Sequence, residues 1–209
     1  MSDPEDRILF LGPDRSPLLR WLREAGETVV PASDLVNAAY VKENRITFII
    51  SYGYRHILKM EVLKRLPDRA INLHISYLPW NRGTDPNLWS FAEDSPKGVT
   101  IHYIDEGIDT GDIIVQRKVE FPKSERQTLA TTYEKLHVVI QELFREHWRD
   151  IKRGRCPRRR QSGEGSYHTV RDRETLAHLL TRGWDTQVSA LGEYAARIRL
   201  GRRLGPPWS

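Results

Sequence analysis

The sequence predicts an α/β fold built on a mainly parallel sheet, and three observations lead there. Short apolar runs alternate with longer amphipathic stretches over residues 7–67. The run at residues 46–53 is apolar on both faces, as in a strand covered by helices on each side. A chain of 209 residues, 39% of them hydrophobic, is long enough for one full-sized core and a small extension. We therefore expect a helix-covered parallel sheet.

The first half of the chain reads as a repeated strand-helix unit. Ser16 as N-cap, Pro17 at the first helical position and the closing Gly26 delimit the first helix, and Pro67 ends the third. The expected strands are residues 7–12, 27–30, 46–53 and the run that begins at 70, and the expected helices are 16–26, 33–44 and 56–67.

The second half closes the core and then becomes polar. We expect a short helix at 87–94 and two strands joined by an acidic, glycine-containing loop between Ile104 and Ile113. A capping box of Ser124 and Gln127 predicts the start of a long amphipathic helix that ends near Gly154. A linker, two short helices (172–183 and 184–198) and a loosely ordered tail (199–209) should follow. The predicted domains are 1–154 and 155–209.

The positive charge of the chain is concentrated in one segment. The formal net charge is +5, but residues 149–160 alone hold seven Lys or Arg against one Asp. A run of this kind is typical of a solvated linker or helix end, with phosphate binding as the alternative. We interpret Arg158, Arg159 and Arg160 as a solvated patch.

Composition also indicates where the protein works. No apolar stretch approaches the roughly 20 residues of a membrane span, and "MSDPEDRILF" lacks the layout of a signal peptide. We expect a cytoplasmic protein. A single cysteine, Cys156, excludes an internal disulfide and a Cys-type zinc site.

The stretch "AINLHISYLPWNRG" is unusual for a buried strand. Asn72, His74 and Ser76 would share one face, yet a central parallel strand meets a ligand only beyond its carboxyl end. An amide, an imidazole and the carboxylates of "DEGIDTGD" suit acyl transfer to an amine, which needs a proton acceptor and an oxyanion donor. We interpret His102 as a structural residue, because Thr100 and Ile104 on its face show no further polar pattern.

The sequence lacks the motifs that are typical of several other enzyme classes. There is no glycine-rich dinucleotide or P-loop motif, no H-E-x-x-H and no G-x-S-x-G. A metal hydrolase using His74, His102 and Asp109 is a weaker alternative, since three separate segments would have to converge. No metal site is expected.

Two motifs together resemble a known family. "NLHISYLPWNRG" followed by "GVTIHYIDEGIDTGDII" is similar to the formyltransferases that use N10-formyltetrahydrofolate. The resemblance is detailed over about residues 46–119. It implies a Rossmann-like formyltransferase core, with Asn72, His74 and Asp109 as the catalytic residues. Asn72 and His74 would steady the formyl oxygen and Asp109 would orient the imidazole, while either His74 or Asp109 could take the amine's proton first.

The resemblance also implies where the folate co-substrate binds. It would lie in a cleft beside the acidic loop and the segment "SYGYRHI". The implied N10-formyltetrahydrofolate-binding residues are Tyr52, Gly53, Tyr54, Ile57, Asp105, Glu106, Gly107 and Ile108.

Departures from the family pattern indicate the acceptor. Pro13 and Pro17 replace the phosphate-binding turn of the purine enzyme, and the residues after Gly154 read as helical rather than as the β-barrel of the tRNA enzyme. "LPWNRGTDPNLWSF" resembles the enzymes that formylate nucleotide-linked amino sugars, which implies a 4-amino-4,6-dideoxy sugar acceptor used in surface-glycan biosynthesis. The expected substrate contacts are Trp80, Asn81, Arg82, Asn87 and Trp89.

Alternative functions and expected partners complete the analysis of the sequence. A methionyl-tRNA formyltransferase-like enzyme and a basic nucleic-acid-binding protein are the alternatives. We expect a nucleotide sugar as the substrate and a homodimer as a possible assembly. We expect no membrane span and no binding of nucleic acid.

Overall fold

The computed structural model describes the backbone of residues 6–122 and 126–204, and side chains within these ranges as far as residue 196. Contacts divide the chain into two compact units. Unit 1 comprises Met1–His74, Thr100–Gln116 and Ile140–Gln161, and unit 2 comprises Ile75–Val99, Arg117–Val139 and Ser162–Ser209. The boundary expected at residue 154 stays a prediction.

A six-stranded sheet carries the polar strand. Its order is β2-β1-β3-β4-β6-β7. The strands are β1 (Arg7–Leu11), β2 (Thr28–Ala32), β3 (Phe48–Ser51), β4 (Ala70–His74), β6 (Gly98–Tyr103) and β7 (Ile113–Lys118). Strands β1 to β4 pair in parallel and β6 pairs antiparallel to β4, so the sheet is mainly parallel, as expected.

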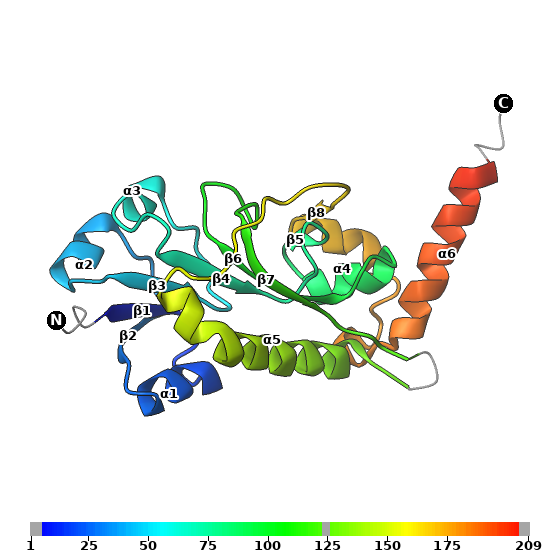
Figure 1. Cartoon of the computed structure of the whole chain (residues 1–209). Coiled ribbons are helices and arrows are strands. Elements are labelled where there is room, and N and C mark those ends of the chain that lie inside the picture. Colours follow the sequence, from blue (N-terminus) through cyan, green and yellow to red (C-terminus); the bar gives the residue numbers. More distant parts are fainter. Residues whose placement is uncertain (1–5, 123–125, 205–209) are drawn as a thin grey trace. The chain divides into compact units, whose positions relative to one another are not determined.

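Helices cover both faces of this sheet in unit 1 (Figure 1). They are α1 (Pro17–Glu24), α2 (Ala38–Glu43), α3 (Met60–Leu63) and the unit 1 part of α5 (Leu129–Lys152). Phe48 packs edge-on against Trp148 of α5, at 5.3 Å between ring centroids. Ile49, which points the other way, belongs to a buried cluster with Val41 of α2 and Val62 of α3. Both faces of β3 are therefore buried, as its apolar sequence predicts.

Two helices of unit 1 are shorter than expected, and a side-chain hydrogen bond explains the later start of the first. Asn37 caps α2 by accepting from the amide of Tyr40 at 2.8 Å, so this helix begins after residue 37 rather than at 33. The hydroxyl of Tyr54 donates to the carbonyl of Asp34 and accepts from the amide of Val36. These bonds join the segment after β3 to the segment before α2. Of the expected helix at 56–67, only residues 60–63 are α-helical.

Unit 2 contains a small parallel sheet that pairs distant segments. Strand β5 (Arg82–Gly83) pairs with β8 (Tyr167–His168). Helix α4 (Pro86–Ala92) and helix α6 (Val188–Leu204) contribute to a buried cluster around Leu88, Leu129 and Leu191. The segment after α5 was expected to be a linker, but it supplies a strand.

The C-terminal helices differ from expectation. Residues 171–176 and 183–185 form 3₁₀ helices, η1 (Arg171–Leu176) and η2 (Gly183–Asp185), in place of longer α-helices. Helix α6 continues to Leu204, where the sequence predicted a loosely ordered tail from 199. Ser124 of the predicted capping box lies outside the described residues, and α5 begins at Leu129. Among the described helices, none is long and apolar enough to cross a membrane.

His137 in α5 gives unit 2 a pH-dependent stability. Burial lowers the pKa of this imidazole from 6.5 to about 4, and the ring lies 4.2 Å from that of Tyr133. A group whose folded pKa is below its unfolded value binds more protons when unfolded, so the free energy of unfolding falls as the pH drops from 6.5 towards 4.

We predict that His137→Phe reduces this pH dependence. The phenyl ring keeps the apolar contact with Tyr133 but does not titrate. Between pH 7.5 and pH 5, wild type should lose about 2 kcal/mol more unfolding free energy than the variant. Denaturant unfolding at the two pH values measures the difference, and equal losses in both proteins would contradict the prediction.

Candidate active site

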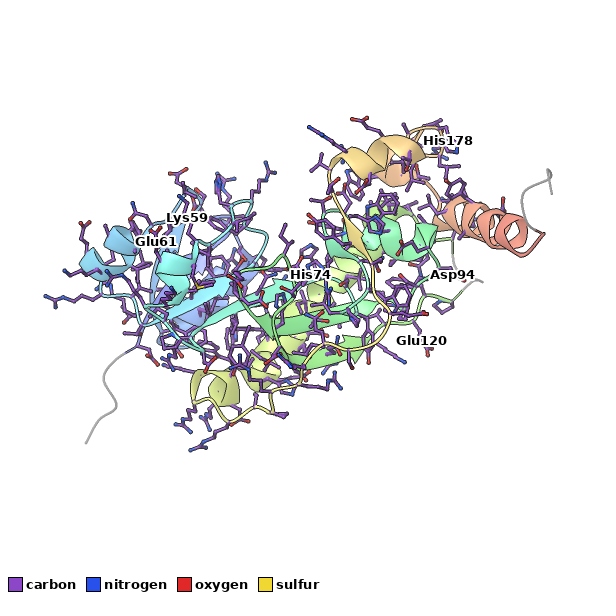
Figure 2. The ribbon with its side chains drawn as sticks, turned by 90° about the horizontal axis from the view of Figure 1, so that it is seen from above. Lys59, Glu61, His74, Asp94, Glu120 and His178 are labelled. Carbon is purple, nitrogen blue, oxygen red and sulfur yellow. The ribbon has the colours of Figure 1, made fainter. Side chains whose placement is uncertain are left out.

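Strand pairing sets the polar residues of β4 and β6 side by side in unit 1. Asn72 is the register partner of Ser51 on β3 and of His102 on β6. Directly opposed residues of an antiparallel pair have Cβ atoms about 5 Å apart on the same face. His74 lies at the end of β4 (Figure 2), and strand alternation puts its side chain on the same face as that of Asn72. Both imidazoles are buried, at 7% and 2% exposure for His74 and His102.

Asp109 reaches these groups from the acidic loop between β6 and β7. Its carboxylate oxygen Oδ1 accepts from Nδ2 of Asn72 at 3.0 Å and lies 3.4 Å from Nε2 of His102. Its other oxygen, Oδ2, lies 3.6 Å from Nδ1 of His74. The three expected catalytic residues are therefore brought together, and His102 joins them.

A second contact of His102 fixes a hydrogen on its Nδ1. Its Nδ1 lies 2.7 Å from the carbonyl oxygen of Tyr103, which can only accept, so Nδ1 carries the hydrogen. In the neutral ring Nε2 is then an acceptor, and it lies 3.3 Å from Nδ2 of Asn72. Both Nδ2 hydrogens of Asn72 thus have acceptors, Asp109 and His102. The register across β4 and β6 places His102 beside Asn72 and Asp109, so the residue interpreted as structural lies within the cluster, and its role there stays a prediction.

The contact between His74 and Asp109 also sets what His74 can do. With Nδ1 facing the carboxylate, the opposite nitrogen Nε2 can exchange a proton with a ligand. A carboxylate that is only 12% exposed interacts more strongly with an imidazolium than it would in water. The 3.6 Å between Nδ1 of His74 and Oδ2 of Asp109 is within the range of an ion pair and is longer than a hydrogen bond.

Ser76, the third polar residue of the unusual stretch, has a different role. It is buried, and its hydroxyl donates to the carbonyl of Trp80 at 2.8 Å in unit 2. This bond ties the turn after β4 together. The polar alternation of the sequence therefore combines two catalytic candidates with one turn-forming residue.

The residues expected to bind folate lie on two segments of unit 1. Tyr52 is buried and its hydroxyl accepts from Nε2 of Gln141 at 3.2 Å, whereas Ile57 is 64% exposed. Gly53 has a φ of +72°, and burial raises the pKa of Tyr54. Glu106 and Ile108 are exposed and Gly107 is half-buried on the acidic loop.

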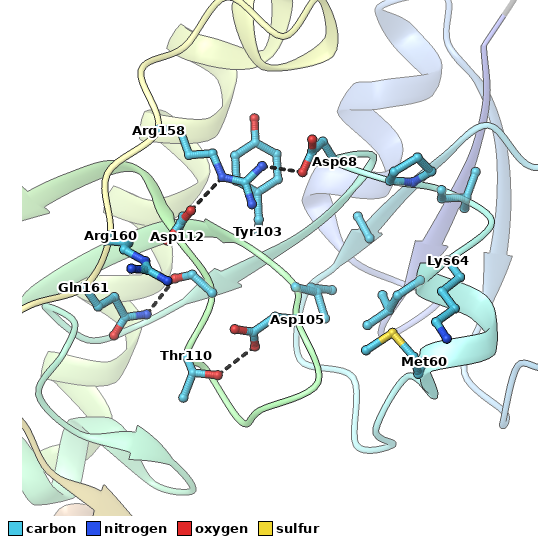
Figure 3. Close-up of a pocket in the computed structure, with 16 residues that line it drawn as sticks. Met60, Lys64, Asp68, Tyr103, Asp105, Thr110, Asp112, Arg158, Arg160 and Gln161 are labelled. Atoms are coloured by element: carbon cyan, nitrogen blue, oxygen red, sulfur yellow. Dashed lines mark hydrogen bonds and ion pairs between the residues drawn. The ribbon is translucent and has the colours of Figure 1, made fainter.

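A cavity of about 530 Å³ lies beside the acidic loop (Figure 3). Asp105 is the predicted folate residue that lines it. Its Oδ1 accepts from the hydroxyl of Thr110 at 2.7 Å and from the amide of Gly107 at 3.1 Å, which fixes the loop from within. The apolar lining comes from Met60, Leu63, Leu66, Pro67, Ala70 and Ile104.

The residues expected to contact the acceptor lie in unit 2, and two amides among them are interior. Asn81 is fully buried; its Nδ2 donates to Glu93 at 2.9 Å and its Oδ1 accepts from Ser95 at 2.8 Å. Asn87 is buried and donates to the carbonyl of Leu129 at 2.9 Å. These bonds give both amides structural roles within unit 2. Trp80 and Arg82 are half-buried.

Trp89 packs on an acid-imidazole pair. Its ring stacks on that of His168 at 3.8 Å, and Nε2 of His168 lies 2.9 Å from Glu93. Burial by itself would raise the pKa of Glu93, but hydrogen bonds from His168, Ser166 and Asn81 outweigh it and lower that pKa. The carboxylate thus joins β8 to the turn before α4.

The basic segment is not simply solvated. Arg158 donates to Asp112 at 2.6 Å, pairs with Asp68 and lies over the ring of Tyr103. Arg159 donates to Gln116 at 2.5 Å. Arg158, Arg159 and Arg160 are all exposed, as expected for a solvated patch, and the first two also contact acceptors within unit 1.

Comparison with known proteins shows the family to which this chain belongs. A model of the formyl transferase family matches residues 23–146. The chain belongs to the formyl transferase family. A crystal structure of the formyltransferase PseJ from Anoxybacillus kamchatkensis, in complex with UDP-4,6-dideoxy-4-formamido-L-AltNAc and tetrahydrofolate, is 51% identical with a TM-score of 0.85. The match covers 90% of this chain and 99% of that one.

Curated relatives are more distant. A dTDP-4-amino-4,6-dideoxyglucose formyltransferase of Mycobacterium bovis is 27% identical over 150 residues, 72% of this chain and 62% of the relative. A methionyl-tRNA formyltransferase of Thermodesulfovibrio yellowstonii is 36% identical over 121 residues, 57% of this chain and 39% of the relative. The chain thus matches 39–62% of the length of these relatives.

We predict that removal of the side chain of Asn72, His74 or Asp109 abolishes most formyl transfer. His74→Ala, Asp109→Ala and Asn72→Ala should each lower kcat by roughly a hundredfold or more, because each removes an interaction with the reacting atoms or their proton. Steady-state kinetics measures the loss, and circular dichroism controls for folding. Near-normal turnover by folded His74→Ala would show that β4 does not carry the active site.

We predict a smaller effect for His102, which holds Asn72. His102→Ala should lower kcat by about tenfold, in line with the loss of one orienting hydrogen bond. The double variant with Asn72→Ala should be little slower than Asn72→Ala alone, since His102 acts through that amide. A double-mutant cycle in kcat measures this coupling, and strictly multiplicative losses would contradict it.

Proposed function

We propose that this protein transfers a formyl group from N10-formyltetrahydrofolate to the amine of a nucleotide-linked 4-amino-4,6-dideoxy sugar. The observation that carries the proposal is the cluster of Asn72, His74 and Asp109 in a chain that belongs to the formyl transferase family. The 51% identity to PseJ over nine-tenths of the chain makes a UDP-linked sugar the first acceptor to test.

The cavity of unit 1 is suited to the donor. A pteridine is flat and apolar on its faces, with hydrogen-bonding groups at its edges. The cavity combines apolar side chains such as Leu63 and Ile104 with polar groups such as Asp105 and Lys64. We place the pteridine part of the folate there, beside the acidic loop that carries Asp109.

The residues of the cluster can perform the proton and charge transfers. When bound, the folate supplies an activated formyl carbon. The acceptor nitrogen forms the new C–N bond and loses a proton, while the bond to N10 breaks and N10 gains a proton. Asp109 holds Nδ1 of His74, so that Nε2 can accept the amine's proton and then return it to the leaving nitrogen.

Asn72 can support the negative charge that develops on the formyl oxygen. Its Nδ2 donates to Asp109 at 3.0 Å and approaches His102 at the longer distance of 3.3 Å. The hydrogen of this longer contact is therefore the one to share with the formyl oxygen, while His102 continues to orient the amide. A fixed amide donor at this position lowers the energy of the transition state.

Several expectations drawn from the sequence remain proposals. The predicted acceptor contacts stay predictions for Trp80, Asn81, Arg82, Asn87 and Trp89. Asn81 and Asn87 are buried in unit 2. A cytoplasmic location, a homodimer and a place in surface-glycan biosynthesis also stay predictions. Nucleic-acid binding is disfavoured because Arg158 and Arg159 already contact acceptors in unit 1.

We predict that the purified protein formylates a UDP-linked 4-amino-4,6-dideoxy sugar in the presence of N10-formyltetrahydrofolate. Mass spectrometry should detect one added formyl group. The matched panel contains dTDP-4-amino-4,6-dideoxyglucose, the free amino sugar, glycinamide ribonucleotide and charged initiator tRNA. Efficient formylation of the last three, without the nucleotide sugars, would overturn the proposed acceptor.

Arg82 should recognise the diphosphate of the acceptor. Arg82→Ala is expected to raise KM for the nucleotide-linked sugar by about tenfold or more, because a charge-assisted contact to phosphate is lost. The same change should leave transfer to the bare amino sugar almost unaltered. Equal losses on both acceptors would place the effect of Arg82 elsewhere.

A further inference from the structure

The loop that carries Asp109 is held from outside by residues 158–161, which follow the last turn of α5 and are here called the strap. The backbone of Arg159 exchanges two hydrogen bonds with Ile113, the first residue of β7, at 2.7 and 3.0 Å. Arg159 thus forms a single antiparallel β-bridge with the start of β7. All of these residues belong to unit 1.

Gln161 makes the contact nearest to the catalytic acid. Its Nε2 donates to the carbonyl of Asp109 and to the carbonyl of Gly111, both at 2.8 Å. An amide nitrogen has two hydrogens, so one side chain fixes two peptide groups of the loop. The two carbonyls lie on either side of Thr110, which sets the direction of the chain through the catalytic residue.

The backbone at Asp109 requires such support. Asp109 has a φ of +54°, in the left-handed region that residues with a Cβ adopt at a cost in energy. Gly111 lies so close to β6 that a Cβ there would be 1.9 Å from the carbonyl oxygen of Tyr103. The loop is therefore strained at its acid and closely packed two residues later.

The remaining contacts of the strap fix the end of the loop. Arg158 donates from Nε to Asp112 at 2.6 Å and also pairs with Asp68, just before β4. The same guanidinium lies 4.7 Å from the ring of Tyr103, the last residue of β6. Arg158 thus connects the loop to both strands that carry the catalytic cluster.

We propose that Gln161 is a positioning residue for formyl transfer, which holds the backbone of Asp109 so that its carboxylate faces Asn72 and His74. The proposal rests on the proposed function. Gln161 acts through the backbone of the loop that carries Asp109, and it also lines the cavity beside that loop. Its loss should therefore affect the chemical step more than acceptor binding.

The experiment compares Gln161→Glu and Gln161→Ala with the control Ser162→Ala. Glutamate has the same shape but presents an oxygen to the two carbonyls, while alanine removes the side chain. Ser162 is exposed and adjacent in sequence, and the contacts described here do not involve it. The measurements are kcat and KM for the nucleotide sugar, the melting temperature, and amide hydrogen exchange of residues 106–112.

For both Gln161 variants we expect kcat to fall by about ten- to thirtyfold, with KM for the acceptor within threefold and the melting temperature within a few degrees. Exchange in residues 106–112 should rise by about tenfold or more, while exchange in β1 and β3 stays unchanged. Ser162→Ala should behave as wild type in every measurement.

Unchanged kcat or unchanged loop exchange in Gln161→Ala would overturn the positioning role. A rise in KM with normal kcat would also overturn it, because the residue would then act in binding. Wild-type protein that transfers no formyl group to the nucleotide sugar would overturn the proposed function alone. The exchange comparison would still decide whether Gln161 holds the loop.

Discussion

The carboxylate of Asp109 organises the candidate site, since Asn72, His74 and His102 all approach it within 3.6 Å. Antiparallel pairing of β4 and β6 brings an amide and two imidazoles onto one face of the sheet, but the strands supply no acid there. The acid must come from a loop that turns back over that face. A left-handed residue at Asp109 permits this turn, at a cost on the order of 1 kcal/mol.

Local patterns in the sequence predicted most elements of the sheet and the major helices, because each strand and helix has its own periodicity and its own start and stop residues. What the sequence could not provide is pairing between distant strands. The antiparallel alignment of β6 with β4 and the pairing of β5 with β8 depend on contacts between segments far apart in the chain. The start of the short helix α2 depends on the hydrogen bond that the side chain of Asn37 accepts.

The difference between local patterns and long-range pairing also explains which site residues the sequence predicted. Asn72 and His74 are visible in the sequence because they are polar residues in an otherwise apolar strand, and Asp109 is visible through the family motif. His102 has no polar neighbour on its own strand, and its role appears only when Asn72 is seen as its cross-strand partner. Asn81 shows the converse case. Its motif predicts a ligand contact, which stays a prediction, while the structure shows a fully buried side chain among hydrogen-bond partners.

The uneven charge of the chain acquires a physical meaning from these contacts. The acidic loop holds four carboxylates within residues 105–112, and like charges at this density repel one another. The basic segment that ends at Arg160 lies beside it, and Arg158 neutralises Asp112 and Asp68. An exposed ion pair contributes only about 0–1 kcal/mol to stability, so the benefit lies in geometry rather than in folding energy. Complementary charge therefore lets a highly acidic loop stay closed over the strands, which is the arrangement that Asp109 needs.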